Sequence, residues 1–336
     1  MSNTPVDISG YVFLALDNRR VVRAECRGGE WRVETVLDGP APVTLAADPN
    51  QSGVVYAGTQ GNGVFHSGDR GRSWTPLGLA GQIVKSLAVS PHDSRVLYAG
   101  VKPAALFMTT DGGRRWVELE GFRRVPNRWW WFSPAEPPFR AYVNAIAVSP
   151  AAPDVVLAGV ELGALVGSQD GGRTWSAHRS GAIRDCHWLS FHGADGQWAY
   201  QAGGSGGGAA ISRDGGRTWR QPRHGLARHY GVTCAADPER PEIWYAALAP
   251  SPRQAYGRDV KAYLYRASAG ADWQPIGWEP QPMGQMPRAL VTLPRSPGQL
   301  FAGTTFGDVW HTADYGDSWQ RLPFDLGGGL GLQILN

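Results

Sequence analysis

The sequence predicts an all-β fold, a seven-bladed β-propeller with four-stranded antiparallel blades. Tryptophan recurs along the 336 residues at intervals of about 40–60 residues, which is the length of one four-stranded blade. The composition agrees, because 45 glycines and 25 prolines suit many short strands joined by tight turns. The recurring positions are Trp31, Trp74, Trp116, Trp175, Trp219, Trp273 and Trp319.

Five of these tryptophans end a shared turn motif with an aspartate five residues before the tryptophan. Such an aspartate can accept hydrogen bonds from nearby backbone N–H groups, and glycine adopts the positive φ that the turn needs. The tryptophan then begins the next strand and packs between neighbouring blades. The motifs are SGDRGRSW (67–74), TTDGGRRW (109–116), SQDGGRTW (168–175), SRDGGRTW (212–219) and TADYGDSW (312–319). Two further segments keep the tryptophan but lack the aspartate: AECRGGEW (24–31) and RASAGADW (266–273).

This motif resembles that of the BNR/Asp-box repeat β-propeller family, which includes sialidases and other glycoside hydrolases. The chain is also similar to intracellular BNR propellers of the photosystem II assembly-factor type. The resemblance implies that each box lies between strands three and four, away from the functional face, so that its aspartate is structural. The chain departs from sialidases, because it has no Arg-Ile-Pro motif, no matched arginine triad and no Tyr/Glu nucleophile pair. Sialidase activity is therefore not expected.

The other strands of each repeat can also be predicted, and residues 1–336 are expected to form a single propeller domain. Apolar runs such as VVYAG (54–58) suit strands that are buried on both faces between neighbouring blades. The first repeat begins at YVFLAL (11–16), which matches strand two of a blade. The run GLGLQILN (329–336) is therefore predicted to supply the missing strand of blade 1 and to close the ring.

Charge and composition exclude several classes of protein. A net charge of +3 is too small for the dense basic patch of a nucleic-acid-binding protein, so no nucleic acid partner is expected. Residues 1–16 lack the regions of a secretory signal, and no apolar run is long enough to span a membrane. The three cysteines, Cys26, Cys186 and Cys234, do not suggest a disulfide framework. These features predict a cytoplasmic protein with reduced thiols.

Long connections fall on one side of the predicted ring. In each blade, turns 1–2 and 3–4 lie on one side, with the boxes, and connections 2–3 and 4–1 lie on the other. The second side carries the long segments 122–142, 203–208, 249–263 and 278–288. Because long loops on a rigid scaffold often carry binding or catalysis, this side is predicted to be the functional one.

Polar residues are predicted to surround the mouth of the central channel on this side. Strand one of each blade begins there and strand two ends there. Asp185 and His187 are two residues apart in one strand and therefore share a face. A wet channel mouth could also account for any single polar residue in this position. The predicted ring consists of Lys85, Lys102, Asn144, Glu161, Asp185, His187, His229, Tyr230 and Arg288.

This ring predicts acid/base chemistry on a small polar or anionic molecule. Asp185, His187 and Glu161 are the predicted catalytic residues, because a histidine beside carboxylates can exchange protons near neutral pH. No metal is predicted, since the set Glu161, Asp185, His187 and His229 has no metal-ligand spacing motif, and the sequence identifies no cofactor. The predicted ligand-binding residues are Arg288, Lys85, Lys102, Asn144, His229, Tyr230, Trp131 and Arg140.

Two functions are compatible with these features. The first is binding of the small molecule at the channel mouth, with or without turnover by hydrolase- or lyase-like chemistry, so whether the protein is an enzyme stays open. The second is a non-catalytic scaffold that holds a protein partner with the inserted loops, since mixtures of arginine and tryptophan are typical of interfaces. The run Trp129–Trp131 either anchors its loop by burial or forms an exposed platform.

Overall fold

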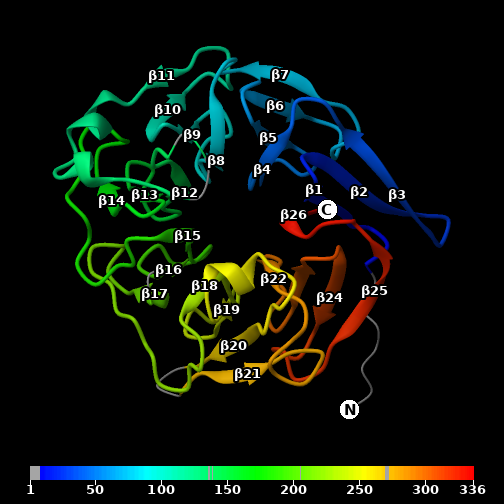
Figure 1. The fold of residues 1–336 in the computed structure, drawn as a ribbon. Helices are drawn as coiled ribbons and strands as arrows, with labels where there is room; N and C mark the ends of the chain where they lie inside the picture. Colours follow the sequence, from blue (N-terminus) through cyan, green and yellow to red (C-terminus); the bar gives the residue numbers. More distant parts are fainter. Residues whose placement is uncertain (1–7, 135–136, 138, 205, 269–271) are drawn as a thin grey trace.

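The chain forms a closed ring of β-sheets in a computed structural model (Figure 1). The structure describes residues 8–134, 137, 139–204, 206–268 and 272–336. Predictions that rest on the other residues lie outside the described part of the chain. These residues are 1–7 at the N-terminus, 135, 136 and 138 in the 122–142 connection, Ser205 in the 203–208 connection, and 269–271 in RASAGADW.

Across the described residues, the strands form seven antiparallel sheets, one for each predicted blade. In every blade the first strand of the sheet lies nearest the centre of the ring (Figure 1). Blade 1 consists of β26 (Leu330–Leu335), β1 (Val12–Asp17), β2 (Arg20–Arg27) and β3 (Glu30–Leu37). Blade 2 consists of β4 (Pro42–Ala47), β5 (Val55–Thr59), β6 (Val64–Ser67) and β7 (Thr75–Gly78), and blade 3 of β8 (Ile83–Val89), β9 (Leu97–Lys102), β10 (Ala105–Thr109) and β11 (Val117–Glu118).

The remaining four blades continue around the ring in sequence order. Blade 4 consists of β12 (Val143–Val148), β13 (Val156–Val160) and β14 (Leu165–Ser168), and blade 5 of β15 (Cys186–Phe191), β16 (Ala199–Gly203) and β17 (Gly208–Ser212). Blade 6 consists of β18 (Tyr230–Ala236), β19 (Trp244–Ala249), β20 (Tyr263–Ala267) and β21 (Gln274–Ile276). Blade 7 consists of β22 (Pro287–Val291), β23 (Leu300–Thr304), β24 (Asp308–Thr312) and β25 (Gln320–Asp325).

The predicted four-stranded blades are observed, but the outer strand is reduced to a few hydrogen bonds in blades 4 and 5. In blade 4, the backbone N–H group of Leu165 donates to the His178 side chain and that of Gly167 to the Ser176 side chain. In a regular ladder, both N–H groups would donate to backbone carbonyls of the outer strand. Side chains that compete in this way weaken a strand ladder. In blade 5, Ile211 pairs with Arg220, and the next position along the ladder is Pro222, which has no N–H to donate.

The C-terminal strand closes the ring, as predicted. Strand β26 is the inner strand of blade 1 and pairs antiparallel with β1, with Val12 opposite Leu335. Figure 1 shows the red C-terminal strand beside the blue N-terminal strands. The two ends of the ring are therefore joined by the backbone hydrogen bonds of one sheet.

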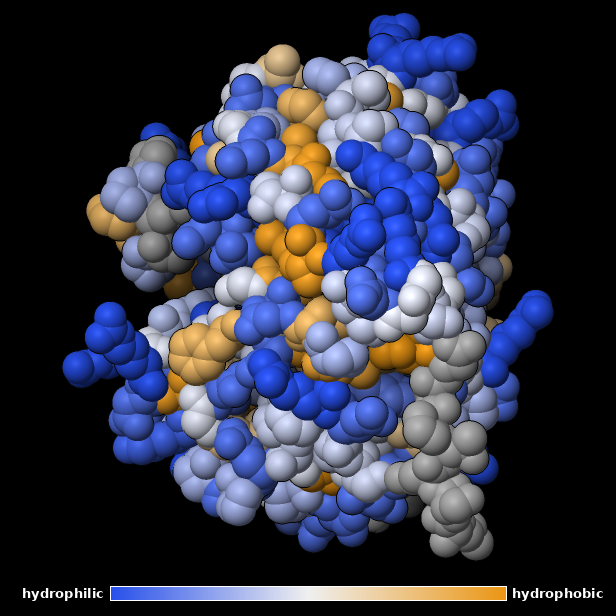
Figure 2. Space-filling model, turned by 90° about the vertical axis from the view of Figure 1, so that its right-hand side faces the viewer, coloured by the Kyte–Doolittle hydropathy of each residue, from blue (hydrophilic) through white to orange (hydrophobic). Residues whose placement is uncertain are grey.

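Apolar side chains fill the spaces between neighbouring blades. Strand β1 shows the pattern, because its successive side chains point to opposite faces. Val12 and Leu14 pack in a cluster with residues of blade 2, whereas Phe13 packs with residues of blade 7. Strands in this position are buried on both faces, which explains their continuous apolar runs. The outer wall around β3 and β25 is mostly hydrophilic, with a band of apolar residues between the polar ones (Figure 2).

Each Asp-box forms a compact turn held by hydrogen bonds within the motif. The Ser168 hydroxyl donates to Asp170 and accepts from the Gly172 N–H, both at 2.8 Å. Asp170 also accepts from the backbone N–H and the hydroxyl of Thr174, and these bonds lower the pKa of Asp170 to about 2. The hydroxyl-to-aspartate and glycine-to-hydroxyl bonds recur in the other four boxes. The box aspartates are thus occupied by the turn itself.

Replacing Asp214 by alanine is expected to lower the free energy of unfolding by about 1–3 kcal/mol, because the turn loses the acceptor of the Thr218 and Arg217 N–H groups. Urea denaturation measures the change. Asp272→Ala is the control, since this exposed residue accepts no hydrogen bond among the described residues, and a change within about 0.5 kcal/mol is expected. Loss of ligand binding in Asp214→Ala at unchanged stability would contradict a structural role.

The lowered pKa of Asp170 also makes the stability of the fold depend on pH. The stabilisation by its carboxylate is present above about pH 4 and is lost as the pH falls toward 2.

The connections divide between two faces of the ring. The boxes bond to the 1–2 turns of their own blades, as the Gly171 N–H does to the Asp154 carbonyl, so we call this side the box face. On the opposite side, the loop face, connections 2–3 and 4–1 contact each other, as Ala262 and Met283 do through a pair of backbone hydrogen bonds. The loop face carries the 3-10 helices η1 (Glu120–Arg124) and η2 (Arg128–Trp130) and the helix α1 (Pro252–Ala255). None of the helices in the described ranges is long and apolar enough to cross a membrane.

Candidate functional site at the channel mouth

The inner strands of blades 2–7 each contain a β-bulge near the loop face. At every bulge, one residue of the inner strand has no partner in the adjacent strand, and a bulge of this kind redirects a side chain. Polar side chains occupy four of the six positions, and all four are among the residues predicted at the channel mouth. The bulged residues are Val43, Lys85, Asn144, His187, Val232 and Arg288.

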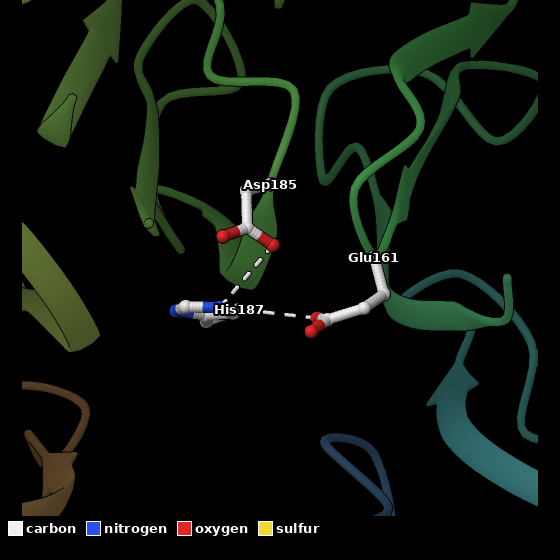
Figure 3. Close-up of side chains that lie close together, drawn as sticks. All are labelled: Glu161, Asp185 and His187. Atoms are coloured by element: carbon white, nitrogen blue, oxygen red, sulfur yellow. Dashed lines mark ion pairs between the residues drawn. The ribbon is translucent and has the colours of Figure 1, made fainter. Parts of the chain in front are cut away.

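Three of the predicted residues meet across two blades. Glu161 directly follows β13 in blade 4, whereas Asp185 and His187 lie at the start of β15 in blade 5. Figure 3 shows both carboxylates pointing toward the imidazole. The Nε2 atom of His187 lies 3.4 Å from Asp185 Oδ1 and 3.8 Å from Glu161 Oε2, and all three side chains are at least nine-tenths buried. The sequence predicted this group correctly as neighbours, and its catalytic role stays a prediction.

The backbone fixes the orientation of His187. Its Nδ1 atom lies 2.6 Å from the carbonyl oxygen of Gly231 in blade 6. Because a carbonyl only accepts hydrogen bonds, Nδ1 must carry a proton and donate it. The Nε2 atom is then the one that faces the two carboxylates and can gain or release a proton. A backbone contact that sets the ring in this way is a feature of acid/base histidines.

The neighbours of His187 favour its charged form. Burial by itself lowers the pKa of a histidine, but the hydrogen bond with Asp185 and the charges of Glu161 and Asp185 outweigh burial here. The pKa of His187 is therefore raised above its ordinary value, and the imidazolium persists to a higher pH than in an ordinary histidine. Asn144 supports the arrangement, because its amide donates to Glu161 Oε2 at 3.4 Å and to the carbonyl of Cys186 at 3.1 Å.

Two tyrosines and an arginine extend this polar group into blades 6 and 7. The Tyr230 hydroxyl lies 3.4 Å from Nε2 of His187. The rings of Tyr230 and Tyr256 meet edge to face at 6.3 Å, and the guanidinium of Arg288 lies 4.3 Å from the centre of the Tyr256 ring. Desolvation around the hydroxyl groups raises the pKa of both tyrosines, although much of the Tyr256 ring is exposed, so both hydroxyls are protonated at neutral pH.

Tyr256 is not among the residues predicted from the sequence, although it lies in the 249–263 loop that was predicted to be functional. Tyr256 ends helix α1, which begins with Ser251 as its N-cap and Pro252 at its first position. A Ser-Pro pair of this kind is a known start signal for a helix and would have been the available clue. Figure 1 shows the short helix in yellow near the centre of the ring, close to β18.

The lysines lie beside the Glu161 segment. The Nζ atoms of Lys85 and Lys102 lie 5.0 and 5.8 Å from the centre of the Tyr142 ring, so both cations face the same aromatic group. The carbonyl of Tyr142 accepts a hydrogen bond from the backbone N–H of Glu161 at 3.0 Å. The two lysines therefore lie near the cluster and are connected to it through Tyr142.

Three predicted residues stand apart from this group. His229 precedes β18 and is exposed, and the bulge of blade 6 falls on Val232 instead. Arg140 is also exposed. Trp131 packs on Phe122 at 5.5 Å and anchors the loop, as the first interpretation of the tryptophan run predicts. Trp129 and Trp130 are exposed, as the second interpretation predicts. The contacts of the described residues place none of the three in the cluster, because the sequence alone shows neither the bulge nor how each side chain points.

The cluster also has the donor types of a metal site. One ligand atom from each of Glu161, Asp185 and His187 can be chosen such that all three lie within 4.8 Å of one another. One imidazole nitrogen and two carboxylate oxygens could hold a divalent cation such as Zn²⁺. His229 is not part of this set of described residues. The ion pairs between His187 and the carboxylates account for the grouping without a metal.

A separate groove lies between blades 5 and 6 on the box face. Its volume is about 690 Å³, and its lining includes Asp214, Glu242 and Trp273. None of the predicted site residues borders it. Since its walls are largely box and outer-strand residues that already stabilise the blades, the channel mouth is the better candidate for chemistry.

Comparison with solved structures shows the same fold in two kinds of protein. A GH74 xyloglucanase from Xanthomonas campestris matches with a TM-score of 0.64 and 21% identity over 84% of this chain and 45% of the enzyme. A GH74 enzyme from Niastella koreensis matches with a TM-score of 0.63 and 17% identity over 83% and 45%. This chain therefore spans less than half the length of those enzymes.

The second kind of protein is matched over nearly its whole length. YCF48, in a structure with a bound D1 peptide, has a TM-score of 0.61 and 12% identity over 98% of this chain and 96% of YCF48. YCF48 from Cyanidioschyzon merolae has a TM-score of 0.59 and 11% identity over 95% of this chain and 90% of that protein. At such identities the similarity shows the fold alone. No family model matches the sequence, and no curated protein does.

Proposed function

We propose that this chain binds a small polar or anionic molecule at the channel mouth and acts on it by acid/base chemistry of the hydrolase or lyase type. His187 is the proton donor and acceptor in this proposal, and Asp185 and Glu161 tune it. Arg288, Lys85 and Lys102 supply positive charge around the same axis. The observation that carries the proposal is the orientation of His187, whose Nδ1 is held by the Gly231 carbonyl while Nε2 faces both carboxylates.

Keeping Glu161, Asp185 and His187 together in a buried position makes the fold less stable than an apolar cluster would. Burying two carboxylates and an imidazolium requires desolvation that a few apolar side chains at the same place would avoid. Titratable groups with shifted pKa values at the mouth of a channel are typical of functional sites. Structural neighbours that are glycoside hydrolases are compatible with this function, although the similarity in fold does not transfer their activity.

A thermal-shift screen with anionic metabolites and glycans tests the proposal. A ligand present at 100 times its Kd is expected to stabilise the wild type by about 2.7 kcal/mol. Asp185→Asn and Glu161→Gln should reduce the shift, whereas the box-face variant Arg115→Gln should leave it unchanged. If no compound stabilises the wild type, or if hits are indifferent to both site variants, the proposal is wrong.

A scaffold is the second candidate function, and exposed aromatic side chains support it. Trp129 and Trp130 are 75% and 69% exposed and stack on each other at 4.3 Å. Phe132 and Phe139 are also about half exposed on the same loop. Apolar groups gathered on a surface often mark an interface. The bound peptide in the YCF48 structure shows that a propeller of this fold can hold a protein segment. A wild type that no small molecule stabilises would favour this function.

We also propose that the chain is a member of the BNR/Asp-box propellers. The repeated bonds from the box hydroxyls to the aspartates and from the box glycines to the hydroxyls support this assignment. In such a propeller the boxes stabilise the blades, and the loop face remains available for binding.

A further inference from the structure

Arg288 is a partly buried cation, and one of its hydrogen-bond donors is buried and unused. It occupies the bulge of β22, and its Nη1 atom is buried with no hydrogen-bond partner among the described residues. None of its described neighbours forms an ion pair with it. Its guanidinium instead contacts Tyr256, both over the ring and through a side-chain hydrogen bond that does not use Nη1. A buried donor without a partner is unfavourable for folding, so such a group often has a role in binding.

Tyr256 is held firmly in its place over Arg288. Ala255, Val260 and Ala262 of its loop are buried in the apolar cluster between blades 6 and 7. Backbone hydrogen bonds between Ala262 and Met283 tie the loop to the 278–288 connection. Although the loop is well anchored, 57% of Tyr256 is exposed. The residue therefore lies at the border between solvent and the buried Nη1 atom of Arg288.

A continuous polar path joins this pair to the acid/base group. Arg288 lies against Tyr256, Tyr256 against Tyr230, and the Tyr230 hydroxyl 3.4 Å from Nε2 of His187. Positive charge stands at one end of the path, and the carboxylates of Glu161 and Asp185 stand at the other. A ligand that spans the path needs an anionic group at one end and hydrogen-bond donors at the other.

We propose that Arg288 and Tyr256 form a carboxylate-binding clamp for a small hydroxycarboxylate, such as a hydroxy acid or a uronic acid. The ligand carboxylate accepts from Nη1 of Arg288 and from the Tyr256 hydroxyl, and its hydroxyl groups donate to the Glu161–Asp185–His187 group. This inference rests on the proposed function, because it assigns the ligand class of the same site. It adds Tyr256 to the site and gives Arg288 a specific partner.

Charge balance favours a carboxylate over a phosphate. One guanidinium neutralises one negative charge, and planar carboxylates match the guanidinium geometry well. The second negative charge of a phosphate would face the side of the site that carries the carboxylates of Glu161 and Asp185, and like charges repel. Lys85 and Lys102 belong to blade 3, on the far side of Glu161 from Tyr256, so they do not neutralise this charge at Arg288. A single carboxylate with neutral hydroxyl groups attached is fully neutralised by Arg288 and brings no second negative charge toward Glu161 and Asp185.

Calorimetric titration with charged and neutral forms of the same molecule tests the clamp. The probes are glucuronate and glycolate, their neutral counterparts glucose and glycolamide, and inorganic phosphate. The wild type is expected to bind at least one carboxylate more tightly than its neutral counterpart and more tightly than phosphate, with an affinity that falls as salt is added. Arg288→Met is expected to weaken carboxylate binding about 10–100-fold, and Tyr256→Phe to weaken it less.

Stability separates a binding role from a structural one. Without ligand, Arg288→Met should have the same melting temperature as the wild type or a higher one, because it removes a buried unpaired donor. Arg115→Met on the box face is the matched control and should change neither property. A marked loss of stability in Arg288→Met would make the arginine structural and overturn the clamp.

The outcomes also separate the clamp from the function on which it rests. Equal binding of charged and neutral probes, abolished by Asp185→Asn, would overturn the clamp and keep the acid/base site. Preference for phosphate would overturn the clamp as well. Absence of binding by every probe and by every compound of the wider screen would overturn both.

Discussion

Replacement of His187 by alanine is expected to lower turnover of the bound ligand by about 10²–10⁴-fold, the usual effect of removing a general acid or base. His187 is the group in the cluster whose proton can move near neutral pH, because its Nε2 faces both carboxylates while Nδ1 is held by the Gly231 carbonyl. The assay measures kcat and KM on whichever ligand the screen identifies. A loss confined to KM would make His187 a binding residue.

His187→Gln provides the necessary second variant. Alanine leaves the carboxylates of Asp185 and Glu161 facing each other without a cation, so it could fail to fold for that reason alone. Glutamine keeps a hydrogen-bond donor but does not titrate in this range. It should fold and still lose turnover, whereas the exposed control His224→Ala should be as active as the wild type.

The pH dependence follows from the raised pKa of His187. Its imidazolium is stabilised in the folded protein, so the contribution to stability is fully present below about pH 6.5 and is lost as the pH rises through the raised value. Activity that needs the protonated ring should decline over the same upper range. His187→Gln should lack this decline in stability, and an unchanged profile would contradict the assignment.

The largest effect on stability is expected from Glu25, at the seam between blades 1 and 2. Its carboxylate forms ion pairs with Arg23 at 2.9 Å, Arg27 at 2.5 Å and Arg72 at 2.6 Å. The Arg23 side chain is only 1% exposed. Arg23 also donates to the carbonyl of Arg70 in the box turn of blade 2. Glu25→Ala would leave the buried arginine largely uncompensated, and a loss of about 3–5 kcal/mol in the free energy of unfolding is expected.

Two variants and the pH dependence check this explanation. Glu34→Ala removes the exposed partner of Arg23 and should cost at most about 1 kcal/mol. Arg23→Met combined with Glu25→Leu should recover most of the loss, because no buried charge remains. Burial opposes the ionisation of Glu25, but its bonds with Arg23 and Arg27 prevail and lower its pKa to about 2. Its stabilisation is therefore present above about pH 4.5 and is lost as the pH falls toward 2.

The repeat pattern predicted the fold because its causes are local. A box turn closes through hydrogen bonds among eight consecutive residues, and an apolar run that is buried on both faces needs no knowledge of its neighbours. The closure by 329–336 followed from counting strands. The weak outer strand of blade 4 could not be predicted in this way, because the contacts of His178 and Ser176 that disrupt it depend on how two strands meet.

The site was predictable only in part, for a related reason. Asp185, His187 and Glu161 could be placed together because the strand ends on one face of a ring converge. The bulges could not be predicted, because a bulge exists only in the pairing of two strands. In blade 6 the bulge falls on Val232, and the predicted residue His229 is exposed. The position of Tyr256 could not be predicted either, because it depends on how helix α1 packs against β18 and β19.

The pairing of β26 with β1 also governs how the chain can fold. These two strands come from opposite ends of the sequence, so their pairing requires the closure of a loop nearly as long as the chain itself. During synthesis, the open edge of β1 has no partner until β26 has left the ribosome, and an unpaired strand edge is a site for aggregation. Blades 2–7 consist of consecutive strands and can form in order, whereas blade 1 must wait. Folding of the ring is therefore expected to end with a slow docking step at blade 1.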